Sequence, residues 1–166
     1  MESIKWKVLI TATNHCDCPL NKLSTEQTIM NLAAREEELI EIFDWIEDET
    51  DRYVQIMDYG KKLPAFPEQD RIEENEVKGC QSKVWLTYKF ENGKLHFKAD
   101  SNTAITKGIV AILVYLWSDL TPQEISEASL DILDKIELRK HLTSQRNNGL
   151  AAMVQKMKTV AKLANN

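Results

Sequence analysis

The chain has 166 residues, a length that fits one domain with a short extension. Hydrophobic residues make up 43% and charged residues 28%, which excludes the compositions typical of disordered and membrane-embedded chains. The formal net charge of −5 argues against nucleic-acid binding, because phosphate contacts need a basic surface.

The chain has three cysteines, Cys16, Cys18 and Cys80. An odd and low count argues against a disulfide framework and predicts a cytoplasmic, reducing location. The apolar stretch Val8 to Ile10 is too short for the core of a secretory signal. The longest apolar run, Ile109 to Trp117, falls short of the roughly 20 residues that a membrane helix needs. We therefore expect no membrane contact.

Two helices are predicted in the first part of the chain. Ser24 and Gln27 have the spacing of a capping box, and apolar residues then recur on one helical face as far as Phe43. A second helix is expected over Glu49 to Lys62. Residues 1–23 are assigned to an N-terminal extension of unknown role, and residues 24–166 to one domain.

A small antiparallel sheet of about three strands is predicted next. Asn92-Gly93 is a strong hairpin signal between strands at Lys83 to Phe90 and Leu95 to Ala99. A short edge strand is expected around Asn75 to Val77, inside an otherwise irregular segment that begins at Pro64.

The rest of the chain is predicted to be helical. Asp100 or Ser101 is expected to cap a buried helix that runs to Trp117. Thr121, Pro122 and Glu124 have the pattern of a capped helix start. A short helix over Leu130 to Ile136, a polar loop over His141 to Asn148 and a final amphipathic helix complete the order. Helices, a meander and helices again indicate the α+β class, with helices on one face of the sheet.

Cys80 is the main candidate for chemistry. It follows Gly79, which lets the backbone bend, at the end of an irregular segment and just before a strand. Lys78 could stabilise a thiolate there, the nucleophilic form of cysteine. Position alone favours the alternative, a small apolar side chain at the start of a strand.

Two further groups have weaker signals. His15, Cys16 and Cys18 offer three soft ligands, whereas a structural zinc site normally takes four, so an unstructured polar segment is the favoured interpretation. Arg146 is either solvated or contacts an anion or a partner. The chain has none of the nucleotide-binding or hydrolase motifs such as GxGxxG, Walker A, GxSxG or HExxH.

Glu74 to Trp85, with the letters ENEVKGCQSKVW, resembles the signature of the SufE family of sulfur-acceptor proteins. The likeness extends in the same order from about residue 25 to the C-terminus. Its other strings are Gly60 to Pro64, Ala99 to Gly108, Thr121 to Gln123, His141 to Thr143, Arg146, Gly149-Leu150 and Met153.

The resemblance implies a fold shared with iron–sulfur scaffold proteins and makes Cys80 the acceptor cysteine, which takes persulfide sulfur from a cysteine desulfurase. Gly79, Gln81, Arg146 and, on weaker grounds, Asp100 would be supporting or partner-binding residues. The protein would stimulate the desulfurase and deliver sulfur to an iron–sulfur scaffold complex. It would hold no cofactor or metal of its own, because the pyridoxal phosphate belongs to the desulfurase.

The chain departs from the family at residues 1–23 and at Glu49, where the family tends to have tryptophan; Trp45 lies one helical turn earlier. Two other classes of function stay open: a module that activates a desulfurase without carrying sulfur, and a metal-binding protein that uses residues 15–18. Within the family, a relay to another thiolation pathway also stays open. Whether the protein forms a homodimer also stays open.

Overall fold

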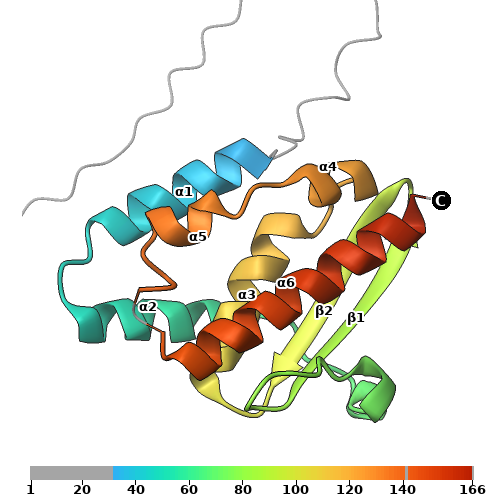
Figure 1. The fold of residues 1–166 in the computed structure, drawn as a ribbon, viewed down its shortest axis with the longest axis horizontal. Coiled ribbons are helices and arrows are strands. Elements are labelled where there is room, and N and C mark those ends of the chain that lie inside the picture. The colour runs from blue at the N-terminus through green and yellow to red at the C-terminus, as the bar shows by residue number, and fades with distance from the viewer. Residues whose placement is uncertain (1–31, 141, 166) are drawn as a thin grey trace, which may run out of the picture.

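The computed structural model describes residues 32–140 and 142–165 (Figure 1). Its elements are α1 (Leu32–Asp44), α2 (Glu49–Lys62), the 3-10 turns η1 (Glu68–Asp70) and η2 (Glu73–Asn75), β1 (Val84–Glu91), β2 (Lys94–Ser101), α3 (Ala104–Trp117), α4 (Pro122–Glu127), α5 (Asp131–Lys135) and α6 (Ser144–Ala164). The cap signal at Ser24 and the 1–23 extension lie outside the described residues.

The sheet of the described chain is the antiparallel hairpin β1–β2, paired from Val84 with Ser101 to Glu91 with Lys94. Asn92 and Gly93 have positive φ angles of 53° and 76°, as the predicted Asn-Gly turn requires. The α+β class is confirmed. The predicted third strand is reduced to one bridge between Glu76 and Trp85, because η2 ends just before it and the chain turns at Gly79 just after it.

One face of the hairpin faces the core. Alternate residues of both strands are buried, among them Val84 and Leu86 of β1 and Phe97 and Ala99 of β2. In Figure 1, α6 crosses in front of the hairpin. The helix α3 packs against β2 and is buried along most of its length. The arrangement is the predicted one, a small sheet with helices on one face.

The helices α2 and α3 cross at very short range. A Cβ atom built on Gly108 of α3 would overlap the backbone carbonyl of Ile56 on α2. A Cβ atom on Gly60 would lie 2.9 Å from the backbone nitrogen of Gly108. Only glycine allows the two backbones to approach this closely, so both positions are set by the packing of the fold.

Helix starts agree with the sequence where the cap is local. Thr121 caps α4 as predicted: its Oγ1 accepts from the Glu124 N–H at 3.3 Å, and Glu124 Oε2 accepts from the Thr121 N–H at 2.7 Å. The N-cap of α3 is Thr103, so the prediction of Asp100 or Ser101 was wrong, because β2 pairing continues through Ser101.

The last helix begins earlier than predicted. The Thr143 side chain accepts from the Arg146 N–H at 3.4 Å and caps α6, which starts at Ser144. The polar loop expected to reach Asn148 is therefore shorter, and Arg146 lies in the first helical turn. The cap satisfies one of the backbone N–H groups that a helix start leaves unpaired.

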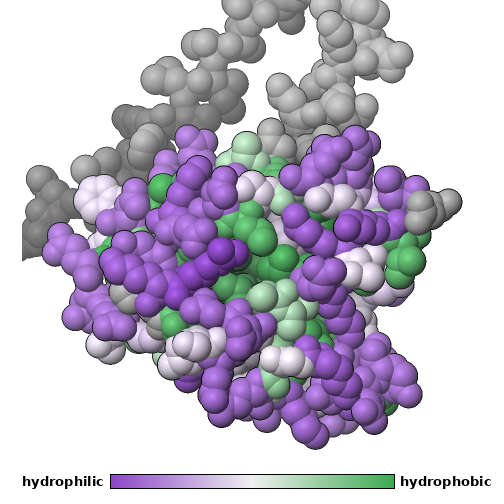
Figure 2. Space-filling model, viewed as in Figure 1, coloured by the Kyte–Doolittle hydropathy of each residue, from purple (hydrophilic) through white to green (hydrophobic). Residues whose placement is uncertain are grey.

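Hydrophilic side chains cover most of the face shown in Figure 2, with hydrophobic ones gathered near its centre. Trp45 is 88% exposed and Glu49 is also exposed, so neither side chain packs in the core. The described helices include none that is long and apolar enough to cross a membrane.

Candidate functional site

Cys80 lies in a loop, residues 78–83, that is closed at both ends. Before the loop, the Val77 N–H donates to the Val84 carbonyl at 2.8 Å. After it, the Lys83 carbonyl accepts from the Ser101 hydroxyl at 2.8 Å and from the Asn102 N–H at 3.2 Å. Gly79 has a φ of +91°, a backbone conformation that favours glycine. Fixed ends and a bend at Gly79 together aim the Cys80 side chain inward.

The Cys80 thiol is half-buried and packs against the start of α6. Its Sγ donates a hydrogen bond to the Gly149 carbonyl at 3.5 Å. A Cβ atom on Gly149 would lie 3.3 Å from Sγ, so glycine at this position leaves room for the thiol. Only the protonated thiol can donate this hydrogen bond.

The electrostatics of the site hold Cys80 in its neutral form. Burial, and after it the negative charge of Glu76, raise the pKa of the Cys80 thiol above its ordinary value. The expected help from Lys78 is absent: its ammonium lies 3.0 Å from Glu73 Oε1 and 3.7 Å from Glu76 Oε2, at the exposed surface. The resting thiol is thus sheltered and weakly nucleophilic.

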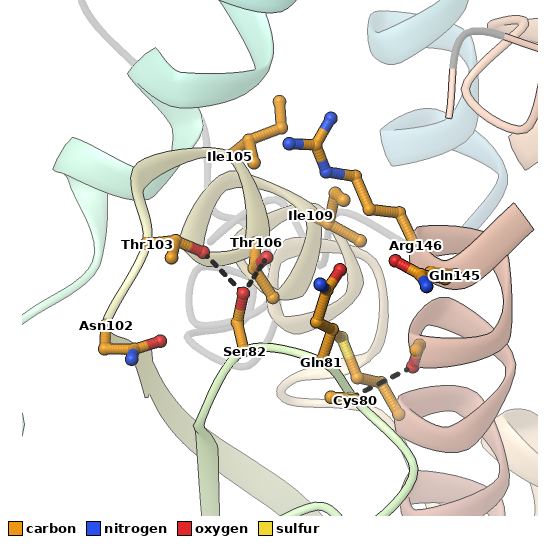
Figure 3. A pocket seen from close by; sticks show the side chains of 12 residues that line it. Cys80, Gln81, Ser82, Asn102, Thr103, Ile105, Thr106, Ile109, Gln145 and Arg146 are labelled. Carbon is orange, nitrogen blue, oxygen red and sulfur yellow. Dashed lines mark hydrogen bonds between the residues drawn. The ribbon is translucent and has the colours of Figure 1, made fainter. Parts of the chain in front are cut away.

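A pocket of about 340 Å³ opens beside the sulfur. Its lining comes from the Cys80 loop, the start of α3 and the start of α6 (Figure 3). Gln81, predicted as a supporting residue, is exposed and lines this pocket with Cys80. A pocket of this size next to Sγ has space for a second sulfur atom.

Arg146, on α6, lines the same pocket. In Figure 3 its guanidinium points toward Ile105, on the far side of Gln81 from Cys80. Within residues 32–140 and 142–165 this guanidinium makes no hydrogen bond or ion pair. A cation in the first turn of a helix is disfavoured by the helix dipole. Arg146 therefore adds little to the stability of α6, and its charge is available to a ligand.

Sequence reasoning missed a hydroxyl cluster on the α3 side of the pocket. The Ser82 hydroxyl accepts from the hydroxyls of Thr103 at 3.0 Å and Thr106 at 3.3 Å (Figure 3). It also missed the contact of Gly149 with the thiol. Glycine inside a helix costs about 0.5–1 kcal/mol relative to alanine, and this cost was the available signal of a close approach.

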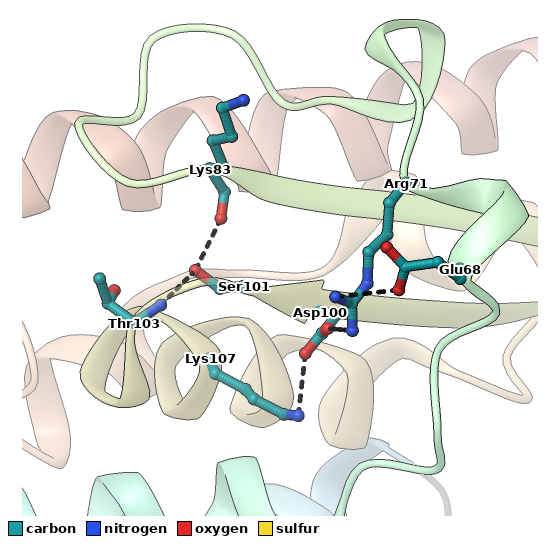
Figure 4. A network of polar contacts seen from close by, with 7 residues as sticks. All are labelled: Glu68, Arg71, Lys83, Asp100, Ser101, Thr103 and Lys107. Carbon is teal, nitrogen blue, oxygen red and sulfur yellow. Dashed lines mark hydrogen bonds and ion pairs between the residues drawn. The ribbon is translucent and has the colours of Figure 1, made fainter.

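Asp100 is not part of the pocket lining. It lies on β2, 4% exposed, where Oδ2 accepts from Arg71 at 2.7 Å and Oδ1 lies 2.8 Å from the Lys107 ammonium (Figure 4). Arg71 also pairs with Glu68 of η1 at 3.2 Å. Asp100 thus ties the segment that precedes the Cys80 loop to the sheet and to α3; its predicted functional role stays a prediction.

In the part of the chain that the structure describes, no cluster of three or more His, Cys, Asp and Glu side chains could hold a metal ion. The candidate ligands His15, Cys16 and Cys18 lie outside that part.

The comparisons with known proteins agree on one family. The family model "SufE: Fe-S metabolism associated domain" matches residues 37–161. An uncharacterised SufE-like protein of Rhizobium meliloti (strain 1021) is 39% identical over 75% of this chain and 93% of its own length. SufE-like proteins of Rhizobium etli and Synechocystis sp. are each 37% identical, over 76% and 74% of this chain and 89% and 77% of theirs.

A solved structure has the same fold. The solution structure of a hypothetical protein from Thermus thermophilus matches with a TM-score of 0.65 at 20% identity, over 78% of this chain and 95% of that one. At this identity the likeness concerns the fold alone. The family match and the relatives carry the assignment: the chain belongs to the SufE family and contains a domain associated with Fe–S metabolism.

Proposed function

We propose that this protein accepts sulfur on Cys80 from the persulfide of a cysteine desulfurase and carries it toward iron–sulfur cluster assembly. The observation that supports this most is the setting of Cys80, a half-buried thiol that faces a pocket from a loop with a glycine bend. A carrier needs such a setting, because a persulfide exposed in a reducing compartment is lost to other thiols.

The transfer is a thiol–disulfide exchange with a terminal sulfur in place of a second chain. The Cys80 thiol first loses its proton. Its thiolate then attacks the outer sulfur of the donor persulfide, and a bond forms between Cys80 Sγ and that sulfur. The sulfur–sulfur bond of the donor breaks, and the donor cysteine leaves as a thiolate. Delivery repeats the exchange with a recipient thiol, so neither step needs an oxidant.

The raised pKa of Cys80 places a condition on this chemistry. Only the thiolate is nucleophilic, and the free protein disfavours it. Docking on the desulfurase would draw the loop out of its contact with Gly149, remove the burial that raises the pKa and bring Sγ to the donor. The resting protein would then react slowly with other sulfur compounds and quickly with its partner.

Arg146 is the candidate for holding negative charge in the exchange. Its guanidinium has no described partner and lies on the pocket that Cys80 faces. Arginine suits both an anionic sulfur and a carboxylate of the partner, because its planar guanidinium donates several hydrogen bonds. Gly79 and Gln81 would shape the loop around this contact.

The pyridoxal phosphate of the reaction belongs to the donor enzyme, and this chain would hold no cofactor or metal of its own. The recipient would be an iron–sulfur scaffold complex. The chemistry fits the cytoplasmic location expected from the three cysteines, because a free acceptor thiol needs a reducing compartment.

Intact mass spectrometry tests the proposal directly. The full chain is incubated with a cysteine desulfurase, its pyridoxal phosphate and free cysteine. We expect an adduct of about +32 Da per sulfur atom, reversed by a reductant and mapped to Cys80, as thiol exchange requires. Cys80→Ser should lose both the adduct and the stimulation of desulfurase turnover while it keeps the circular dichroism of the wild type.

The negative results separate the alternatives. Stimulation that survives Cys80→Ser would identify a module that activates the desulfurase without carrying sulfur. An adduct on Cys80 that passes to another acceptor instead of a scaffold would identify a relay to a different thiolation pathway.

A further inference from the structure

In the segment that leads into Cys80, Val77 is the side chain held in the core, at 3% exposed. The turns η1 and η2 bury no residue, and none of residues 67–76 is buried. A stretch without apolar burial depends on its polar contacts for its position. The pair of Arg71 with Asp100 is one such contact (Figure 4). A second comes from α6.

Lys156 of α6 supplies this second contact. Its Nζ donates to three successive backbone carbonyls, those of Asn75 at 3.0 Å, Glu76 at 3.1 Å and Glu74 at 3.5 Å. Burial, and after it the charge of Lys78, lower the pKa of Lys156. The ammonium is half-buried, and its hydrogen bonds to these carbonyls at the end of η2 replace contacts with water.

One face of α6 contacts residues 74–80 along their length. Gly149, Ala152 and Lys156 are three and four residues apart, a spacing that places them on one helical face. Gly149 accepts from the Cys80 thiol, and a Cβ atom on Gly79 would lie 3.5 Å from the Ala152 Cβ. The segment from 74 to 80 therefore runs along this row, with its base at Lys156 and the thiol at Gly149.

We propose that Lys156 is a positioning residue that sets the resting place of the Cys80 thiol. Lys156 binds the backbone carbonyls of residues four to six positions before Cys80. The thiol itself donates one weak hydrogen bond, to Gly149. Val77, buried and hydrogen-bonded to the Val84 carbonyl, lies between these two contacts. Loss of the Lys156 contact would therefore loosen the residues before Val77 and, through them, the placing of Gly79 and Cys80. The sheltering of a persulfide rests on the proposed function, but the sheltering of the free thiol does not.

Lys158 provides a matched control on the same helix. Its Nζ donates to the carbonyls of Ala128 at 2.7 Å and Ser126 at 3.5 Å, so it too holds a connecting segment through backbone oxygens. These carbonyls belong to the end of α4 and its C-cap, which do not lead to Cys80. The Lys158 ammonium also lies 5.9 Å from the centre of the Trp117 ring, so its removal costs backbone hydrogen bonds and a contact with the core. Only the removal of Lys156 should affect the thiol.

The experiment measures alkylation of Cys80 by iodoacetamide in the full chain without any partner. Peptide mass spectrometry quantifies the label on Cys80 separately from that on Cys16 and Cys18. We expect Lys156→Met to accelerate Cys80 alkylation about tenfold, as the loss of charged hydrogen bonds implies. Lys158→Met should stay near the wild-type rate, and Lys156→Arg, which still donates, should lie closer to wild type than Lys156→Met does.

Urea unfolding of each variant separates positioning from general destabilisation. Equal rates of Cys80 alkylation in Lys156→Met and Lys158→Met overturn the proposal. The proposal is also overturned if, in both variants, alkylation accelerates in proportion to the loss of unfolding free energy. If Lys156→Met does not fold, Lys156→Gln takes its place, because it keeps a donor and should give a smaller rise; no rise overturns the proposal.

The two proposals fail in different ways. A wild-type protein that takes up no sulfur, combined with faster alkylation of Lys156→Met, removes the carrier function and keeps the positioning role. A wild-type protein that takes up sulfur on Cys80, combined with an unchanged alkylation rate in Lys156→Met, keeps the carrier function and removes the positioning role.

Discussion

The glycines Gly108 and Gly149 both allow a close contact between segments, but they differ in what they contact. At the crossing of α2 and α3, Gly108 meets the backbone of Ile56, which cannot move without separating two helices. At the Cys80 loop, Gly149 meets a thiol at the end of a side chain. At Gly108 both partners are helix backbone and neither can move alone. At Gly149 the partner is the Cys80 side chain, which can move with its loop. Rigid packing thus positions the site, and a loose contact leaves the reactive atom free to move.

Gly108→Ala should have the largest effect. Its new Cβ atom would overlap the Ile56 carbonyl, so α2 and α3 must separate and the core must repack. We expect a loss of about 3 kcal/mol or more in the free energy of unfolding, measured with urea. Gly149→Ala, the same substitution in another helix, is the control; equal losses would erase the contrast between the two contacts.

Arg146→Ala should slow sulfur transfer about tenfold or more, the effect of losing a charged hydrogen bond. The rate of persulfide formation on Cys80 measures this. Unfolding free energy and Cys80 alkylation in the free protein should not change, because the guanidinium has no partner among the described residues and points away from Cys80. Arg139→Ala is the control, since Arg139 lies before the same helix and pairs with Asp134 at 3.4 Å. Equal transfer rates would exclude a role for Arg146.

Gly149→Ala should alter the thiol more than the fold. The new Cβ atom would lie 3.3 Å from Sγ and push the thiol from its resting place, so Cys80 alkylation should rise a few-fold. The free energy of unfolding should stay within about 1 kcal/mol of wild type, because alanine favours the helix. Ala151→Gly, at an exposed position of α6, controls for helix propensity. An unchanged alkylation rate would mean that Gly149 does not confine the thiol.

The smallest expected effect is electrostatic. The pH at which Cys80 alkylation is half-maximal should lie above the ordinary thiol pKa of 9.0, because burial and Glu76 raise it. Glu76→Gln should lower that midpoint part of the way, since burial is the larger cause and remains. Glu73→Gln, whose carboxylate pairs with Lys78, is the control. A midpoint that is the same in all three proteins would exclude Glu76 as a cause.

The same shift has a consequence for stability. The folded pKa of Cys80 lies above the unfolded one, so folding favours the neutral thiol. This contribution is complete below the ordinary pKa and is lost as the pH rises through the folded pKa. Unfolding free energies of wild type and Cys80→Ser should therefore differ less at high pH than at neutral pH.

Local signals in the sequence predicted the elements well. The Asn92-Gly93 turn, the Thr121 cap of α4 and the span of α2 depend on neighbours a few residues away, and all three are confirmed. The errors arose where a distant partner decides. Asp100 resembled a helix cap but stays in the hairpin, since pairing with β1 continues past it. The edge strand near Asn75 shrank to one bridge.

By itself, the sequence determined the α+β order and, through the strings around Cys80, the family and the candidate acceptor cysteine. Only the tertiary structure decided the state of that cysteine. The thiol meets Gly149, 69 residues away, and Lys156 reaches the segment before it from about 80 residues away. Burial and charge at a site are sums over such distant neighbours. A pattern of adjacent residues therefore suggested that Lys78 would favour the thiolate, whereas the folded chain buries Cys80 and favours the thiol.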